Sequence, residues 1–118
     1  MESFSQAEWQ TLKEEMRSIL IGMARMRSTI TYSDLAAAMQ TVHMHHRAPY
    51  FHKLLRDMDR EETRGDHPSL ATLVVRKDTG IPGDGYFAGA PTVEGQTFDP
   101  EAYWKTQFDE VCDYWGEK

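Results

Sequence analysis

The chain has almost no cysteine and no long apolar run. Its single cysteine, Cys112, cannot form an intrachain disulfide, which excludes the class of small secreted proteins held together by disulfides. The longest apolar stretch, around residues 19–24, is far shorter than the roughly 20 residues that span a bilayer. The N-terminus also lacks a basic segment followed by a cleavage pattern. We therefore expect a cytoplasmic protein without membrane contact.

The composition is that of an ordinary folded protein. Hydrophobic residues make up 40% and aromatic residues 11% of the 118 residues, so nothing indicates disorder. A chain of this length fits one core and leaves little room for a separate catalytic domain. We expect a single domain over residues 1–118.

Charge is unevenly distributed along the chain. The net charge is -6, yet residues 94–118 hold seven acidic and two basic side chains, a balance of -5. Residues 25–77 hold nine basic and six acidic side chains, a balance of +3. Binding to phosphates needs a positive face, so the middle of the chain is the segment that can face DNA.

Helix-start signals divide the chain into four expected helices. Ser5 and Glu8 form a capping box, and apolar residues at spacings of three and four extend the first helix to about Met26. Thr31 or Ser33 can cap a short second helix that runs through Met39.

Proline marks the start of the other two helices. Pro49 suits the first turn of a third helix over roughly 48–63, and Gly65 with Pro68 supplies its stop signal. Asp99 with Pro100 begins a final helix that carries a spaced apolar face.

Between these helices lies an expected β-hairpin. Residues 70–76 form an apolar, β-branched run of strand length, residues 78–80 (DTG) signal a turn, and a second strand is expected near residues 85–88. A helix pair followed by a hairpin is the order of a winged helix. The predicted fold class is therefore α+β: a helix-turn-helix with a β-hairpin wing and additional N- and C-terminal helices.

The third helix carries the main functional prediction. At about 100° per residue, His52, Lys53, Arg56, Arg60 and Arg64 fall in one sector, nearly opposite the apolar residues. A recognition helix for duplex DNA needs such a division, because its buried face fixes the pose while cations reach phosphates and base edges. The predicted nucleic-acid contacts are Arg47, His52, Lys53, Arg56 and Arg60 on the helix, and Arg76 and Lys77 on the wing.

Two alternative interpretations remain. The acidic residues of this helix can pair with its arginines at helical spacing, so the charged face can be merely a solvated surface. A second possibility is a protein-interaction module that binds a basic partner through Asp109, Glu110 and Asp113 of the acidic final helix.

The sequence indicates no catalytic, metal-binding or cofactor-binding site. His43, His45 and His46 with His52 match no standard zinc spacing and read as surface histidines. Residues 80–85 (GIPGDG) lack the spacing of a phosphate-binding loop, and Cys112 lies on an apolar face. We expect no metal, no cofactor, no catalytic residue and no enzymatic activity.

Residues 30–36 (ITYSDLA) resemble the "(V/I)TTYGDLA" segment in the DNA-binding domain of O6-alkylguanine-DNA alkyltransferases and alkyltransferase-like proteins. Arg47-Ala48 resembles the "RAVG" start of that family's recognition helix, which implies a DNA-contacting role for Arg47. Residues 70–73 (LATL) stand where the family has Pro-Cys-His-Arg, so the reactive cysteine is absent and alkyl transfer is not implied.

Residues 73–87 are also similar to a hairpin, "LVV.K.TG.PG.G(F/Y)F", in a group of small bacterial proteins of unknown function. That similarity is closer, and it implies a fold without an activity.

Overall fold

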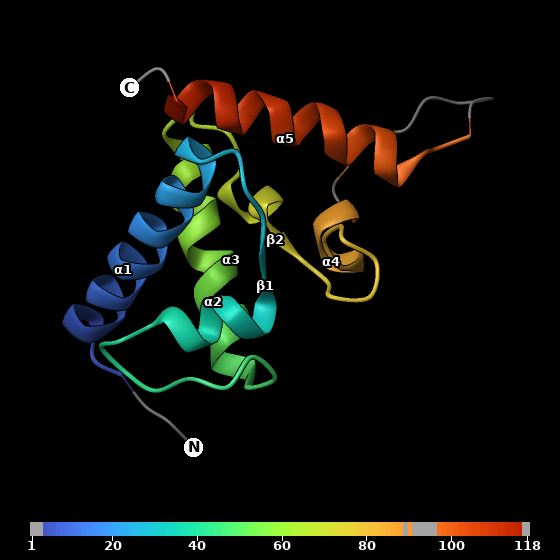
Figure 1. Ribbon diagram of the computed structural model, residues 1–118. Helices are drawn as coiled ribbons and strands as arrows, with labels where there is room; N and C mark the ends of the chain where they lie inside the picture. The colour runs from blue at the N-terminus through green and yellow to red at the C-terminus, as the bar shows by residue number, and fades with distance from the viewer. Residues whose placement is uncertain (1–3, 89, 91–96, 117–118) are drawn as a thin grey trace.

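The computed structural model describes residues 4–88, 90 and 97–116. Three long helices dominate it (Figure 1): α1 (Gln6–Arg25), α3 (Pro49–Arg64) and α5 (Pro100–Gly116). The shorter elements are the strands β1 (Ile30–Thr31) and β2 (Val74–Val75), the helices α2 (Tyr32–Ala38) and α4 (Asp84–Phe87), and the 3-10 helix η1 (Leu70–Leu73). None of the described helices combines the length and apolar character that crossing a bilayer requires.

The predicted helix starts are confirmed. The Ser5 hydroxyl accepts from the Glu8 N–H, while the Glu8 carboxylate accepts from the Ser5 N–H. The Thr31 hydroxyl caps α2 by accepting from the Asp34 N–H. Pro49 stands at the first position of α3, and the Asp99 carboxylate accepts from the first free N–H groups of α5. Satisfying these donors explains why the helices begin where they do.

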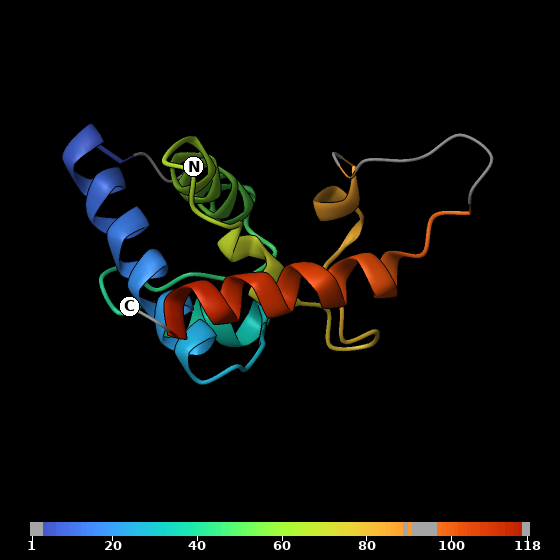
Figure 2. The ribbon, with the colours of Figure 1, turned by 90° about the horizontal axis from the view of Figure 1, so that it is seen from above.

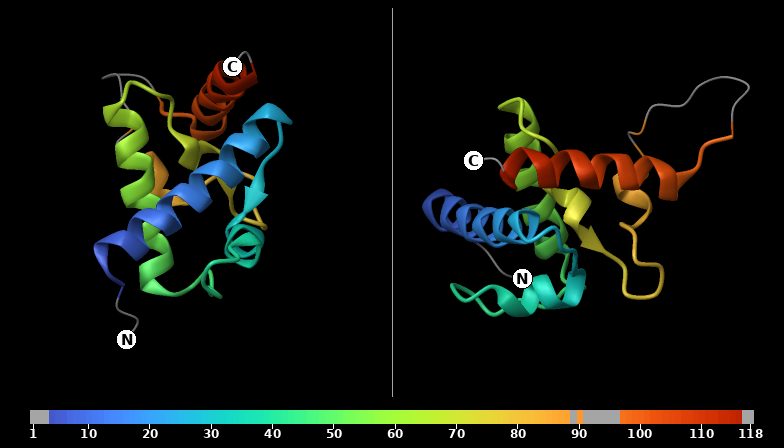
Figure 3. Two further views of the ribbon diagram at one scale, coloured as in Figure 1. Left: turned by 90° about the vertical axis from the view of Figure 1, so that its left-hand side faces the viewer. Right: turned by 45° about the horizontal axis from the view of Figure 1, so that its top comes forward.

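The core lies between α1, α3 and α5. Helices α1 and α3 pack against each other, and α5 crosses one end of the pair and covers η1 (Figure 3). The largest fully buried hydrophobic side chains come from all three helices, α2, η1 and β2: Leu12, Met16, Leu20, Leu35, Phe51, Leu54, Met58, Leu70, Leu73, Val74 and Val111. Helix α4 stands apart from this core (Figure 2).

The prediction of a winged helix is wrong. The described strands form one two-stranded sheet in which β1 and β2 run parallel, with Ile30 opposite Val74 and Thr31 opposite Val75. Where the second hairpin strand was expected, residues 84–87 form helix α4. The expected first strand is also shorter, because residues 70–73 form η1 and only Val74–Val75 is extended.

Local chemistry explains the absence of a wing. The chain turns after β2 through hydrogen bonds from Arg76 N–H to the Ile81 carbonyl and from Gly80 N–H to the Arg76 carbonyl. Pro82 follows directly, and proline is rare inside strands. Gly83 in extended conformation leads into α4, whose first turn carries Asp84. The backbone of β2 pairs with β1 instead.

Two glycine substitutions should change the free energy of unfolding in opposite directions. Gly22 lies inside α1 with nothing within 4 Å of an added Cβ, so Gly22→Ala should stabilise the protein by about 0.5–1 kcal/mol. Gly80 has φ +76°, where a side chain is strained, so Gly80→Ala should destabilise it by about 1 kcal/mol. Urea denaturation measures both, and effects of the same sign would contradict the assigned backbone.

Candidate functional site: an arginine-lined cleft

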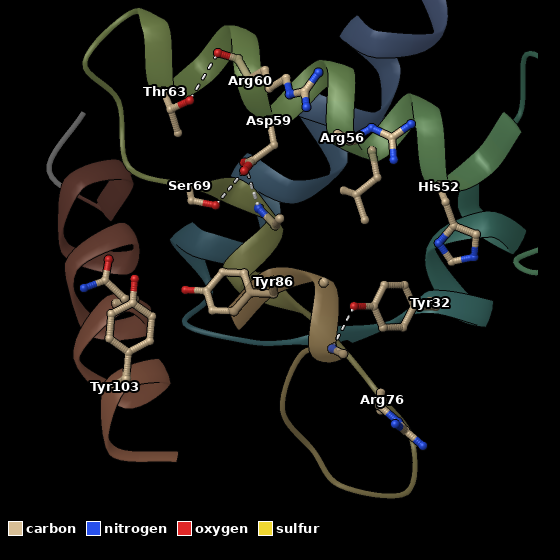
Figure 4. Close-up of a pocket in the computed structure, with 15 residues that line it drawn as sticks. Tyr32, His52, Arg56, Asp59, Arg60, Thr63, Ser69, Arg76, Tyr86 and Tyr103 are labelled. Carbon is tan, nitrogen blue, oxygen red and sulfur yellow. Dashed lines mark hydrogen bonds between the residues drawn. The ribbon is translucent and has the colours of Figure 1, made fainter. Parts of the chain in front are cut away.

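The polar face of α3 forms one wall of a cleft of about 870 Å³, which we call the arginine cleft. His52, Arg56, Asp59, Arg60 and Thr63 line this wall, which is the clustering that helical periodicity predicts. Tyr86 from α4 and Tyr103 and Gln107 from α5 line the facing side, and Tyr32 and Arg76 complete the lining (Figure 4). The cleft therefore combines guanidinium groups with phenol rings.

Asp59 links η1, which forms the floor of the cleft, to α3. Its carboxylate accepts from the Ser69 hydroxyl at 2.7 Å and from the Ala71 N–H at 3.0 Å, and these residues lie at the start of η1. Burial raises the pKa of Asp59 above its ordinary value, while hydrogen bonds from Ser69 and the η1 backbone act against that shift. Since both carboxylate oxygens already accept a hydrogen bond, Asp59 positions η1.

Hydrogen bonds fix two of the three tyrosines. The hydroxyls of Tyr86 and Thr72 lie 2.8 Å apart, and burial raises the pKa of Tyr86 to about 12. The Tyr32 hydroxyl accepts from the Gly83 N–H at 3.1 Å. Trp104 also donates through its indole N–H to the Thr72 carbonyl at 2.8 Å, which ties α5 to η1. Both tyrosine side chains are thus held in position.

Arg56 and Arg60 differ from most other cations of the chain. Among the described residues, no carboxylate lies within 4.0 Å of either guanidinium, and both side chains are exposed. Arg76, in contrast, donates to both Asp78 carboxylate oxygens, at 3.0 and 2.8 Å. Figure 4 shows Arg56 and Arg60 on the α3 wall, with Arg76 beyond Tyr32 and directed away from them. The uncompensated charge of the cleft therefore lies on α3.

The other predicted contacts lie elsewhere. Lys53 forms an ion pair with Asp57 at 2.6 Å and lies 5.2 Å above the Trp9 ring, on the side of α3 that meets α1. Arg47 lies in the loop before α3, where its N–H donates to His45. Lys77 is exposed in the turn after β2. The structure thus brings together His52, Arg56, Arg60 and Arg76, but places Arg47, Lys53 and Lys77 outside the cleft.

Two of the histidines before α3 stack on each other. His45 and His46 stack with ring centroids 4.6 Å apart, and the described part of the chain contains no group of three His, Cys, Asp or Glu side chains placed to hold a metal. Desolvation lowers the pKa of His46, and the neighbouring His45, Arg47 and His52 lower it further. Since a lowered pKa favours the neutral imidazole, His46 adds a polar group beside Arg47 and no fixed charge.

The acidic face of the final helix is partly neutralised. Arg27, at φ 52° just after α1, pairs with Asp113 at 2.7 Å and with Asp109 at 3.3 Å. Lys105 also pairs with Asp109 at 3.0 Å. A basic partner docking on α5 would compete with these internal pairs, so the charge count of the segment overstates its attraction for such a partner.

No protein-family model, curated protein or solved structure matches the chain. The similarity to alkyltransferase-like proteins therefore rests on the quoted sequence segments alone. Sequence reasoning missed Tyr32, Asp59 and Tyr86 as cleft residues. Helical periodicity places Asp59 beside Arg56 and Arg60, but no pattern in the sequence brings the two tyrosines to that wall.

Replacing Asp59 by Asn should alter the pH dependence of stability. The raised pKa means that the folded state binds a proton more readily than the unfolded state, so wild-type stability falls as pH rises above the ordinary carboxyl range. The stability of Asp59→Asn relative to wild type should therefore increase between about pH 4 and about pH 7. Denaturant titrations at several pH values measure this difference, and a pH-independent difference would refute the assignment.

Proposed function

We propose that the protein binds nucleic acid through the α3 wall of the arginine cleft, with Arg56 and Arg60 contacting phosphates. The observation that carries the proposal is that these two guanidiniums lie one helical turn apart, face a cleft and have no carboxylate partner within the described part of the chain. Guanidinium is the side chain best suited to phosphate, because its planar donors match phosphate oxygens.

Further polar groups lie in line with these two residues. His52 precedes Arg56 on the same wall, and Arg47 lies in the loop before α3. A row of hydrogen-bond donors along one helix can follow a phosphate backbone, which fixes position without reading sequence.

Of the predicted duplex-DNA contacts, His52, Arg56 and Arg60 share one wall of the cleft. Lys53 lies over Trp9 of α1, and Lys77 has no projecting hairpin from which to act.

The binding test is a fluorescence-anisotropy titration of labelled DNA, single-stranded and duplex, at several salt concentrations. Arg56→Ala combined with Arg60→Ala should weaken binding about tenfold or more, and the slope of log K against log salt should become shallower by about 2. Loss of two phosphate contacts is the physical reason.

Arg25→Ala combined with Lys105→Ala is the matched control. Both of these cations are exposed, neither lies on α3 and neither lines the cleft, so the net charge changes equally while the cleft remains intact. The control should change the affinity less than about threefold. Absence of binding by wild type at low salt, or equal losses in the two double variants, would refute the proposal.

A further inference from the structure

The shape of the arginine cleft determines which form of nucleic acid can enter it. Its α3 wall faces α4 and α5 across a concave space, with η1 at the base (Figure 4). A duplex is read by elements that project into its grooves, and the structure presents Arg56 and Arg60 inside a hollow. A volume of about 870 Å³ suits a ligand of small-molecule size, such as one or two nucleotides.

The negative charge around the cleft favours a short contact with nucleic acid over one that continues along α5. The protein has a net charge of -6, and the exposed Glu101 and Glu110 lie on α5, the helix that supplies Tyr103 and Gln107 to the facing side of the cleft. A rigid duplex that lay across the α3 wall would bring its second strand toward this acidic helix. A flexible single strand can enter the positive hollow and leave without following α5.

The tyrosines supply a stacking surface for bases, whose faces are exposed in a single strand and covered in a duplex. The faces of unpaired bases are free to stack on aromatic side chains, and this stacking is the usual source of single-strand affinity. Tyr86 is fixed by Thr72, whereas the Tyr103 hydroxyl has no hydrogen-bond partner among the described residues. Tyr103 is half-buried beside Tyr86, Phe87 and Phe98, an aromatic surface at the mouth of the cleft.

We infer that the arginine cleft binds a segment of single-stranded nucleic acid, with its phosphates on Arg56 and Arg60 and a base against Tyr103. The inference rests on the proposed function and narrows it from nucleic acid in general to the single-stranded form. Positions 56 and 60 are about 6 Å apart along the axis of α3, so both can contact neighbouring phosphates of one strand.

The experiment compares one labelled oligonucleotide of roughly 12 nucleotides, within the range of known single-strand sites, alone and annealed to its complement. Wild type should bind the single strand at least tenfold more tightly. Tyr103→Leu should weaken single-strand binding about tenfold and change duplex binding less than twofold, because only the single strand stacks on the ring.

Tyr103→Phe is the matched control, since it keeps the ring and removes only the hydroxyl. It should retain single-strand affinity, and thermal unfolding of both variants reports whether the α5 packing is preserved. Equal loss of single-strand affinity in Tyr103→Phe and Tyr103→Leu would show that the ring does not stack on a base, and would overturn the inference.

The outcomes separate the inference from the proposed function. If duplex binds as tightly as the single strand and Arg56→Ala with Arg60→Ala weakens both, the inference fails and the proposed function stands. If neither form binds at low salt, both fail. Displacement of the oligonucleotide by a free nucleoside monophosphate at comparable concentration would identify a small-ligand site and overturn the inference.

Discussion

The attachment of η1 to α3 by Asp59 determines how the rest of this structure is placed. One carboxylate holds the Ser69 hydroxyl and the Ala71 N–H. The next residue, Thr72, then bonds to Tyr86 through its hydroxyl and to Trp104 through its carbonyl. A chain of hydrogen bonds thus connects α3 to α4 and to α5 through η1. Because hydrogen bonds in a partly buried setting are directional and costly to leave unmade, this chain sets the spacing of the walls between which the cleft lies.

Much of the helical framework could be predicted from local sequence because helix starts have local causes. Ser5 with Glu8, Thr31, Pro49 and Asp99 each satisfy or remove donors of their own helix, so a few residues suffice to place them. The clustering of Arg56 and Arg60 with His52 follows equally from the period of one helix.

The errors lie where tertiary contacts outweigh local preference. The apolar run 70–75 is buried, and burial alone does not distinguish a strand from a short helical turn. Residues 85–88 resemble a second strand, but residues 84–87 form α4 and Tyr86 turns inward to Thr72. Lys53, placed with the other cations by periodicity, instead lies over Trp9 of α1. Such choices depend on partners far along the chain, which no local pattern specifies.

The parallel pairing of β1 with β2 has a consequence for how the molecule assembles. Joining Ile30 to Val74 closes a loop of roughly 40 residues, and the entropy of that closure must be offset by contacts already made. A two-residue ladder supplies few such contacts, so the packing of α1 against α3 supplies most of them. The turn leading to α4 follows β2 directly, so the register of this short ladder also determines where α4 and its wall of the arginine cleft lie.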